Sequence, residues 1–195
     1  MIYHSVAEIF AANDEMRRRL INRLEGLNDA EQNFHASNEA WSIAEIVEHL
    51  SIIEKQMCAL TMKLLARAEA SIDTSAPPFD LQSNPVSMQA FAEQAAREKY
   101  RAPEAVRPTG AVSIAESLAG MQRTRESLRQ LQPRLEAANL SSASFPHPFF
   151  GALNLYEWLA FIGMHEARHL RQIEVVTAAP EFKSLDAAHA AETGA

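Results

Sequence analysis

Residues 154–173, NLYEWLAFIGMHEARHLRQI, combine a helix start with a long apolar stripe. Asn154 and Glu157 have the spacing of a capping box, in which the Asn side chain and the Glu side chain each accept a backbone N–H of the first turn. Beyond them, apolar residues recur at helical spacing. His165 and His169 are one turn apart on that same face. The segment therefore predicts an amphipathic helix that directs two imidazoles into a core.

Three other segments begin with a Ser-x-Ala-Glu capping box and continue with an apolar pattern of period 3.6, so the sequence predicts four long helices. The boxes are Ser5–Glu8, Ser42–Glu45 and Ser113–Glu116. The predicted helices run from Ser5 to about Glu25, from Ser42 to about Ala70, from Ser113 to about Pro133, and from Asn154 to about Ala178. Pro133 is expected to kink or end the third helix, and Pro180 to end the fourth.

The connections between these helices differ in length. Residues 71–112 separate the second helix from the third, are rich in proline and serine near their start, and include a shorter predicted helix over residues 87–100. Residues 139–153 predict an apolar, helix-breaking loop. Such a long connection predicts an all-α four-helix bundle with a crossover between helices two and three. We expect one bundle domain over residues 1–180 and a flexible C-terminal tail over residues 181–195.

Composition limits the class of protein. The chain has 195 residues, 47% apolar and 22% charged, which fits one globular domain with a full core. Its net charge of −7 argues against a nucleic-acid-binding surface. Cys58 is the single cysteine, the N-terminal segment lacks the pattern of a signal peptide, and no apolar run reaches membrane-spanning length. We therefore expect a cytoplasmic protein without a membrane partner.

A third histidine, His49, lies on the flank of the apolar stripe of the second helix, within residues 41–50 (WSIAEIVEHL). It could reach the neighbouring helix that carries His165 and His169. Three neutral imidazoles would leave coordination positions open on a metal ion, which is typical of catalytic rather than structural sites. The alternative is that these are core or half-exposed histidines whose hydrogen bonds are satisfied within the protein.

Two stretches together resemble the DinB-like superfamily of metal-binding four-helix bundles. They are Trp41-Ser-x-x-Glu45-x-x-x-His49-Leu50 and His147-Pro-x-Phe-Gly151-x-Leu-x-x-x-Glu157-Trp158-Leu-x-Phe-x-x-x-His165-x-x-x-His169-x-x-Gln172-Ile173, and the resemblance spans residues 1–178. It implies that His49, His165 and His169 are the metal ligands. It also implies one divalent transition metal ion, with zinc the first choice and nickel, iron or manganese as alternatives, and a homodimer.

His165-Glu-x-x-His169 also fits the zincin protease pattern. The metzincin extension would need glycine and histidine where Gln172 and Val175 stand, and no sheet is predicted upstream to hold a peptide. We therefore reject the protease interpretation.

The resemblance implies metal-dependent chemistry on a small-molecule substrate, a low-molecular-weight thiol in an S-transferase-like reaction, or hydrolysis. Glu166 and Gln172 are the candidate catalytic residues, to move a proton or orient a water near the metal. The alternative is a metal-binding or sensor bundle without enzymatic activity. The sequence does not choose between them.

Overall fold

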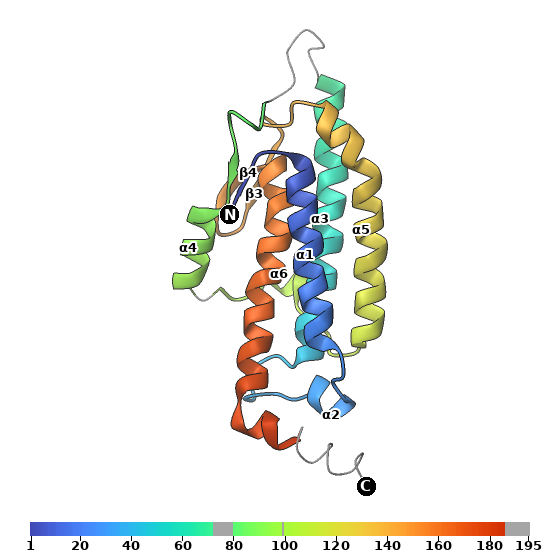
Figure 1. Ribbon diagram of the computed structural model, residues 1–195, viewed down its shortest axis with the longest axis vertical. Coiled ribbons are helices and arrows are strands. Elements are labelled where there is room, and N and C mark those ends of the chain that lie inside the picture. The colour runs from blue at the N-terminus through green and yellow to red at the C-terminus, as the bar shows by residue number, and fades with distance from the viewer. Residues whose placement is uncertain (72–79, 99, 186–195) are drawn as a thin grey trace.

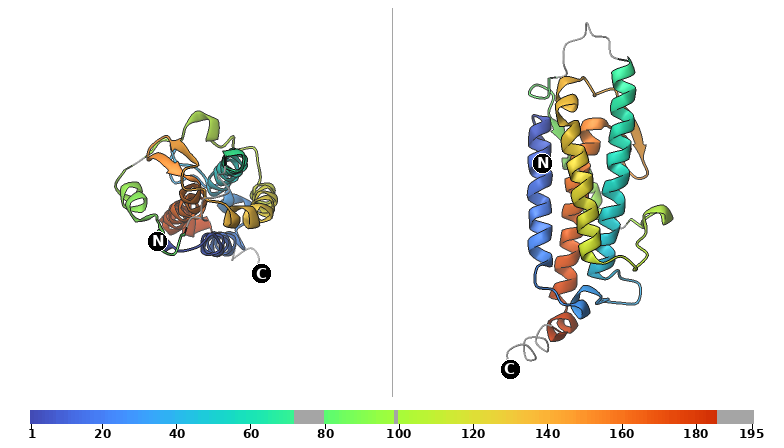
Figure 2. Two further views of the ribbon diagram at one scale, coloured as in Figure 1. Left: turned by 90° about the horizontal axis from the view of Figure 1, so that it is seen from above. Right: turned by 90° about the vertical axis from the view of Figure 1, so that its right-hand side faces the viewer.

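The computed structural model describes residues 1–71, 80–98 and 100–185. Its framework is four long helices: α1 (Val6–Leu24), α3 (Ile43–Ser71), α5 (Ile114–Ala137) and α6 (Leu155–Ala178). They pack side by side, and the end-on view in Figure 2 shows them as a ring in the order α1, α6, α3, α5. The predicted all-α four-helix bundle is therefore confirmed.

Capping explains why the helices begin where the sequence predicts. The side chains of Ser5, Ser42, Ser113 and Asn154 each accept the backbone N–H three residues on. In the last three, the glutamate at that position also accepts the N–H of the cap residue. Each of the long helices starts at the residue after its cap, as the capping boxes predict.

The crossover follows from the direction of the helices. Figure 1 shows that α3 and α5 run the same way, so the chain must return along the length of the bundle between them. This return contains β2 (Val86–Ser87), α4 (Gln89–Arg97) and the short 3₁₀ helix η1 (Glu104–Val106). Helix α4 lies outside the bundle, on the side of α6. The helix predicted over residues 87–100 is thus present in shorter form, and residues 72–79 lie outside the described part.

Two small antiparallel pairings were not predicted. β1 (Ile2–Tyr3) pairs with β2, and β3 (Ser144–His147) pairs with β4 (Gly151–Asn154). Residues 139–153 form no helix, as the helix-breaking loop predicts, but the sequence did not predict that β3 and most of β4 lie within them. Gly151 has φ +74°, a conformation that favours glycine, and this lets the chain turn tightly enough to pair.

Pro133 does not end α5, which continues to Ala137. The proline lies on the exposed face of the helix, one turn from its end. The carbonyl that loses its partner there can bond to water, so the helix tolerates the ring.

The beginning of the predicted flexible tail is packed. Residues 180–185 are helical, and Phe182 is buried against Phe34, with ring centroids 5.6 Å apart. Phe34 follows the short helix α2 (Asp29–Gln32) at the same end of the bundle. The prediction of a flexible tail from residue 181 is wrong for residues 181–185, because burying Phe182 stabilises this short helical segment. Residues 186–195 lie outside the described part.

The helices bury two apolar clusters, and the α6 face predicted from the sequence contributes to both. Ile162, His169, Ile173 and Val176 are all buried. Among the described helices, none is both long enough and apolar enough to cross a bilayer.

Candidate metal centre

Three imidazoles meet between α3 and α6. Nε2 of His49 lies 3.1 Å from Nε2 of His165, and one nitrogen from each of His49, His165 and His169 falls within 4.8 Å of the others. The ring centroids are 4.6 to 5.3 Å apart. His49 and His169 are buried, and His165 is partly exposed. The structure thus brings together the three residues proposed as ligands.

His49 is oriented by a carbonyl of the crossover. Its Nδ1–H donates to the Val106 carbonyl at 2.6 Å, which leaves the lone pair of Nε2 directed at the cluster. The crossover is anchored by the residue before the histidine. The buried Glu48 carboxylate accepts the backbone N–H groups of Thr109 and Gly110, both at 2.9 Å. Two adjacent residues of α3 thus have linked roles: His49 is the candidate ligand, and Glu48 holds the loop whose carbonyl orients it.

His169 is oriented from its own helix. Its Nδ1–H donates to Oε1 of Gln172, 2.9 Å away and one turn along α6. Nε2 of His169 is then the nitrogen with the free lone pair. A histidine that donates its other ring N–H to a fixed acceptor is typical of metal-ligating histidines.

Burial keeps the imidazoles neutral. It lowers the pKa of His169 to about 3, with a further contribution from His49, and it lowers the pKa of His165 well below the usual value, with His169 as the next cause. The pKa of His49 is also lowered by burial, although its bond to Val106 opposes the change. Neutral imidazole is the form that binds metal, so protons compete weakly for this site.

The spacing of the His49 and His165 nitrogens fits a small transition metal ion. Two nitrogens each about 2.0–2.1 Å from a tetrahedral zinc ion lie roughly 3.3 Å apart. The 3.1 Å between His49 and His165 is close to that value. Three nitrogen donors suit zinc, nickel and iron alike, so the donor set fits the expected cofactor without choosing the metal.

Aromatic rings cover the cluster on two sides. Trp41 lies against His49 with centroids 4.9 Å apart and stacks over His169 at 6.4 Å. Phe161 stacks on His165 at 5.7 Å. The His147 ring also contacts Phe161, with centroids 4.7 Å apart, and stacks on Phe150. Burial lowers the pKa of His147 to about 4.

Glu166 lies in a buried ionic network. Its carboxylate accepts from Nε of Arg17 at 2.7 Å, and Nη2 of the same guanidinium donates to Glu54 at 2.7 Å. Nη2 of Arg125 lies 2.8 Å from Glu54 and 3.6 Å from Glu166. Burial raises the pKa of Glu166, against the effect of the two arginines. Glu166 is buried, because α1, α3 and α5 cover this side of α6.

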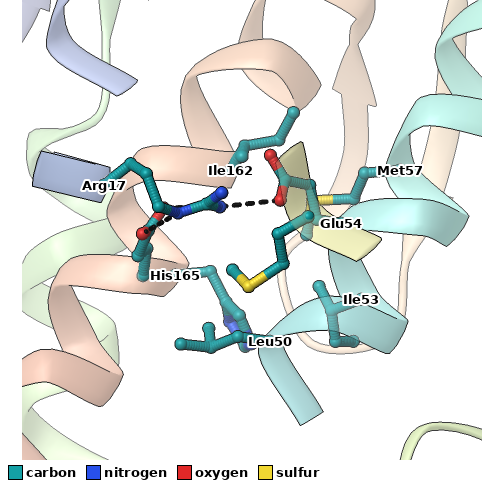
Figure 3. A pocket seen from close by; sticks show the side chains of 9 residues that line it. Arg17, Leu50, Ile53, Glu54, Met57, Ile162 and His165 are labelled. Atoms are coloured by element: carbon teal, nitrogen blue, oxygen red, sulfur yellow. Dashed lines mark hydrogen bonds and ion pairs between the residues drawn. The ribbon is translucent and has the colours of Figure 1, made fainter. Parts of the chain in front are cut away.

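A cavity of about 10 Å³ separates this network from the histidines (Figure 3). Arg17, Glu54, Glu166 and His165 line it together with apolar side chains of α3, α5 and α6. That volume suits a single water molecule rather than a substrate. The catalytic role of Glu166 stays a prediction. Its hydrogen bonds to Arg17 favour a structural role.

Two other residues of α3 lie outside the site. The Glu45 carboxylate accepts the backbone N–H of Ser42, and the acceptor for His49 is the Val106 carbonyl. Cys58 is buried and lies 4.0 Å from the Thr124 carbonyl, outside the histidine cluster. Sequence reasoning missed Val106 because a backbone carbonyl in an irregular loop leaves no side-chain signal.

We expect Gln172→Met to weaken metal binding by about 10- to 100-fold, since it removes the acceptor that orients His169. Competition with a chromophoric chelator measures the affinity. Gln172→Glu, which keeps an acceptor, should retain it. Glu174→Gln, an exposed change on the same helix, is the control. Equal affinities for all four proteins would show that this hydrogen bond does not support the site.

We expect the metal-free protein to lose stability as the pH falls below about 6.5, the ordinary pKa of histidine. The folded-state pKa of His169 is lower, so the unfolded chain takes up the proton first and unfolding becomes more favourable. His169 alone should contribute roughly 1 kcal/mol per pH unit in this range. Urea unfolding between pH 7 and 5, with chelator present, measures the slope. A slope that His169→Asn leaves unchanged would contradict the assignment.

The fold and the imidazole cluster define the class: a helical bundle with a candidate three-histidine metal site. The chain belongs to the DinB superfamily, whose family model matches residues 12–173. It is also 30% identical over 169 residues to a Bacillus subtilis (strain 168) protein named Uncharacterized protein YuaE, covering 84% of this chain and 93% of that protein.

A solved structure supports the fold. The chain is similar to TT2238, described as a four-helix bundle protein, with a TM-score of 0.57 and 22% sequence identity. The match covers 87% of this chain and 98% of that one. At this identity the likeness shows the architecture alone.

Proposed function

We propose that this protein binds one divalent transition metal ion, zinc first, through Nε2 of His49, His165 and His169. We further propose that it uses the ion in a reaction, either S-transfer from a small thiol or hydrolysis of another small molecule. The observation that carries the proposal is the convergence of the three imidazoles, with His49 and His169 oriented through Nδ1 by Val106 and Gln172. Such pre-orientation is characteristic of metal ligands.

A metal held in this way lowers the pKa of a bound water or thiol and polarises a carbonyl. The residues of the chain supply the surroundings for that chemistry. Trp41 and Phe161 cover two sides of the cluster, which reduces its contact with water. His165 is the partly exposed imidazole, so we place the approach of a substrate on its side.

Metal binding without catalysis is the second candidate function. It is favoured by the packing of Phe150 onto Phe91, His147 and Phe161, which places bulky rings on the side of the site next to His165. In this case the bundle would store or sense a metal ion, and Phe161 would limit access to it.

Elemental analysis of freshly purified protein tests the metal. We expect a stoichiometric transition metal, or stoichiometric rebinding of zinc after chelation. Protein that neither contains nor rebinds zinc, nickel, iron or manganese would overturn the proposal. Offering metal-loaded protein several thiols with an epoxide or aryl halide tests the reaction. Metal-dependent turnover supports the enzyme, and full metal occupancy without turnover supports the second candidate.

A further inference from the structure

Arg168 lies on α6 between two of the candidate ligands. It is three residues after His165 and directly before His169, and side chains three apart on a helix have Cβ atoms about 5–6 Å apart. The side chain is half-buried. Its Nη1–H donates to the Ala95 carbonyl at 2.6 Å, and its guanidinium carbon lies 5.7 Å from the centre of the Tyr100 ring. The crossover therefore fixes the guanidinium of a residue that lies next to two candidate ligands on α6.

Arg168 differs from the two buried arginines of the described residues in its lack of a counter-ion. Arg17 and Arg125 each contact carboxylates within 3 Å. Among the described residues, no carboxylate lies within ion-pair distance of Arg168, and its one hydrogen bond goes to a neutral carbonyl. Most of its five N–H donors are thus available to a ligand.

The charge of Arg168 reaches the site. It contributes, after larger causes, to the lowered pKa values of His165 and His169. A metal cation bound by these imidazoles would be repelled by the same guanidinium. An anionic group placed between the two cations would remove this repulsion and form charge-assisted hydrogen bonds to the planar fork of the arginine.

The Arg168 side chain is also partly exposed, as His165 is. His165 is the partly exposed imidazole, and Arg168 follows it by almost one turn on α6. The Tyr100 ring lies next to the guanidinium, with Phe149 packed on it at 4.5 Å between centroids, and would border a ligand that reaches Arg168. A small molecule could then contact the metal and Arg168 at once.

We propose that Arg168 binds the anionic group, most simply a carboxylate, of a small thiol whose sulfur occupies the open position of the metal. This inference rests on the proposed function and specifies its substrate class as anionic thiols. Arg168 is accordingly a specificity-determining residue. Its neighbour on the same helix, Arg171, is exposed and has no such place in the site.

The test uses protein loaded with Co²⁺, whose thiolate charge-transfer absorption reports thiol binding without any turnover. Mercaptopropionate, mercaptoethanol and cysteamine serve as anionic, neutral and cationic probes. We expect mercaptopropionate to bind about tenfold or more tightly than mercaptoethanol, as for one charge-assisted hydrogen-bonded pair, and cysteamine to bind most weakly. Arg168→Met should abolish this preference while leaving the affinity for mercaptoethanol nearly unchanged.

Arg171→Met is the matched control and should keep the preference, and Arg168→Lys should keep part of it. Circular dichroism checks that each variant is folded. A preference for mercaptopropionate that survives in Arg168→Met would mean that its carboxylate chelates the metal directly, and would overturn the role of Arg168. Absence of any preference in the wild-type protein would do the same. Failure to take up Co²⁺ is a different result, which overturns the proposed function and this inference with it.

Discussion

His165→Ala is expected to weaken zinc binding by roughly a hundred- to a thousandfold, because it removes one of three nitrogen donors. Structural zinc sites with four ligands bind with about 10–16 kcal/mol, which corresponds to about 2.5–4 kcal/mol per ligand. The imidazole of His165 contacts both of the others, with ring centroids 5.3 Å from His49 and 4.6 Å from His169. Titration against a chelating indicator measures the loss.

A matched histidine variant separates ligation from general loss of imidazole. His35 is exposed, donates to the Ala40 carbonyl and lies outside the cluster. His35→Ala should therefore bind zinc as the wild type does. Equal zinc affinity in His165→Ala and His35→Ala would mean that the cluster is not the binding site. The metal-free His165→Ala protein should remain folded, since it loses a partly exposed side chain.

Local sequence rules account for most of the fold. The capping residues Ser42, Ser113 and Asn154 set helix starts that the structure reproduces, because the orphan N–H groups of a first turn need these side chains wherever the helix packs. The hairpin of β3 and β4 could not be predicted in the same way. Its pairing depends on the positive φ of Gly151 and on contacts with α6, and short strands leave little periodic signal.

The sequence likewise predicted only part of the candidate site. The histidines of α6 were found from one helix because i and i+4 are necessarily neighbours. The place of His49 on its helix made it a candidate partner, and the family resemblance implied that it is a ligand. Val106 and Arg168 gain their roles from the path of the crossover, which the sequence does not specify. The partner of Glu166 is Arg17, 149 positions away, and no local pattern pairs them.

The second large expected effect is on stability, and it concerns the buried charged groups inside the bundle. The helices α1, α3, α5 and α6 contribute Arg17, Glu54, Arg125 and Glu166 to the network, two cations against two anions, each at most 7% exposed. Such a cluster is a weak source of net stability when complete, because desolvation offsets the attraction. Removing a single member has a much larger cost, since its partners remain buried without compensation.

Arg17→Met is therefore expected to lower the free energy of unfolding by about 3–5 kcal/mol, a large fraction of the stability of a typical domain. It would leave Glu166 with only the more distant Arg125. The adjacent Arg18→Met removes an ion pair that is exposed on both sides, so its denaturation midpoint should barely move. Guanidinium unfolding of the metal-free proteins measures both.

The double variant Arg17→Met/Glu166→Gln should recover part of the loss, because Arg125 and Glu54 still neutralise each other. If Arg17→Met were as stable as Arg18→Met, the carboxylates would have to be protonated in the folded state, and the network would not be ionic.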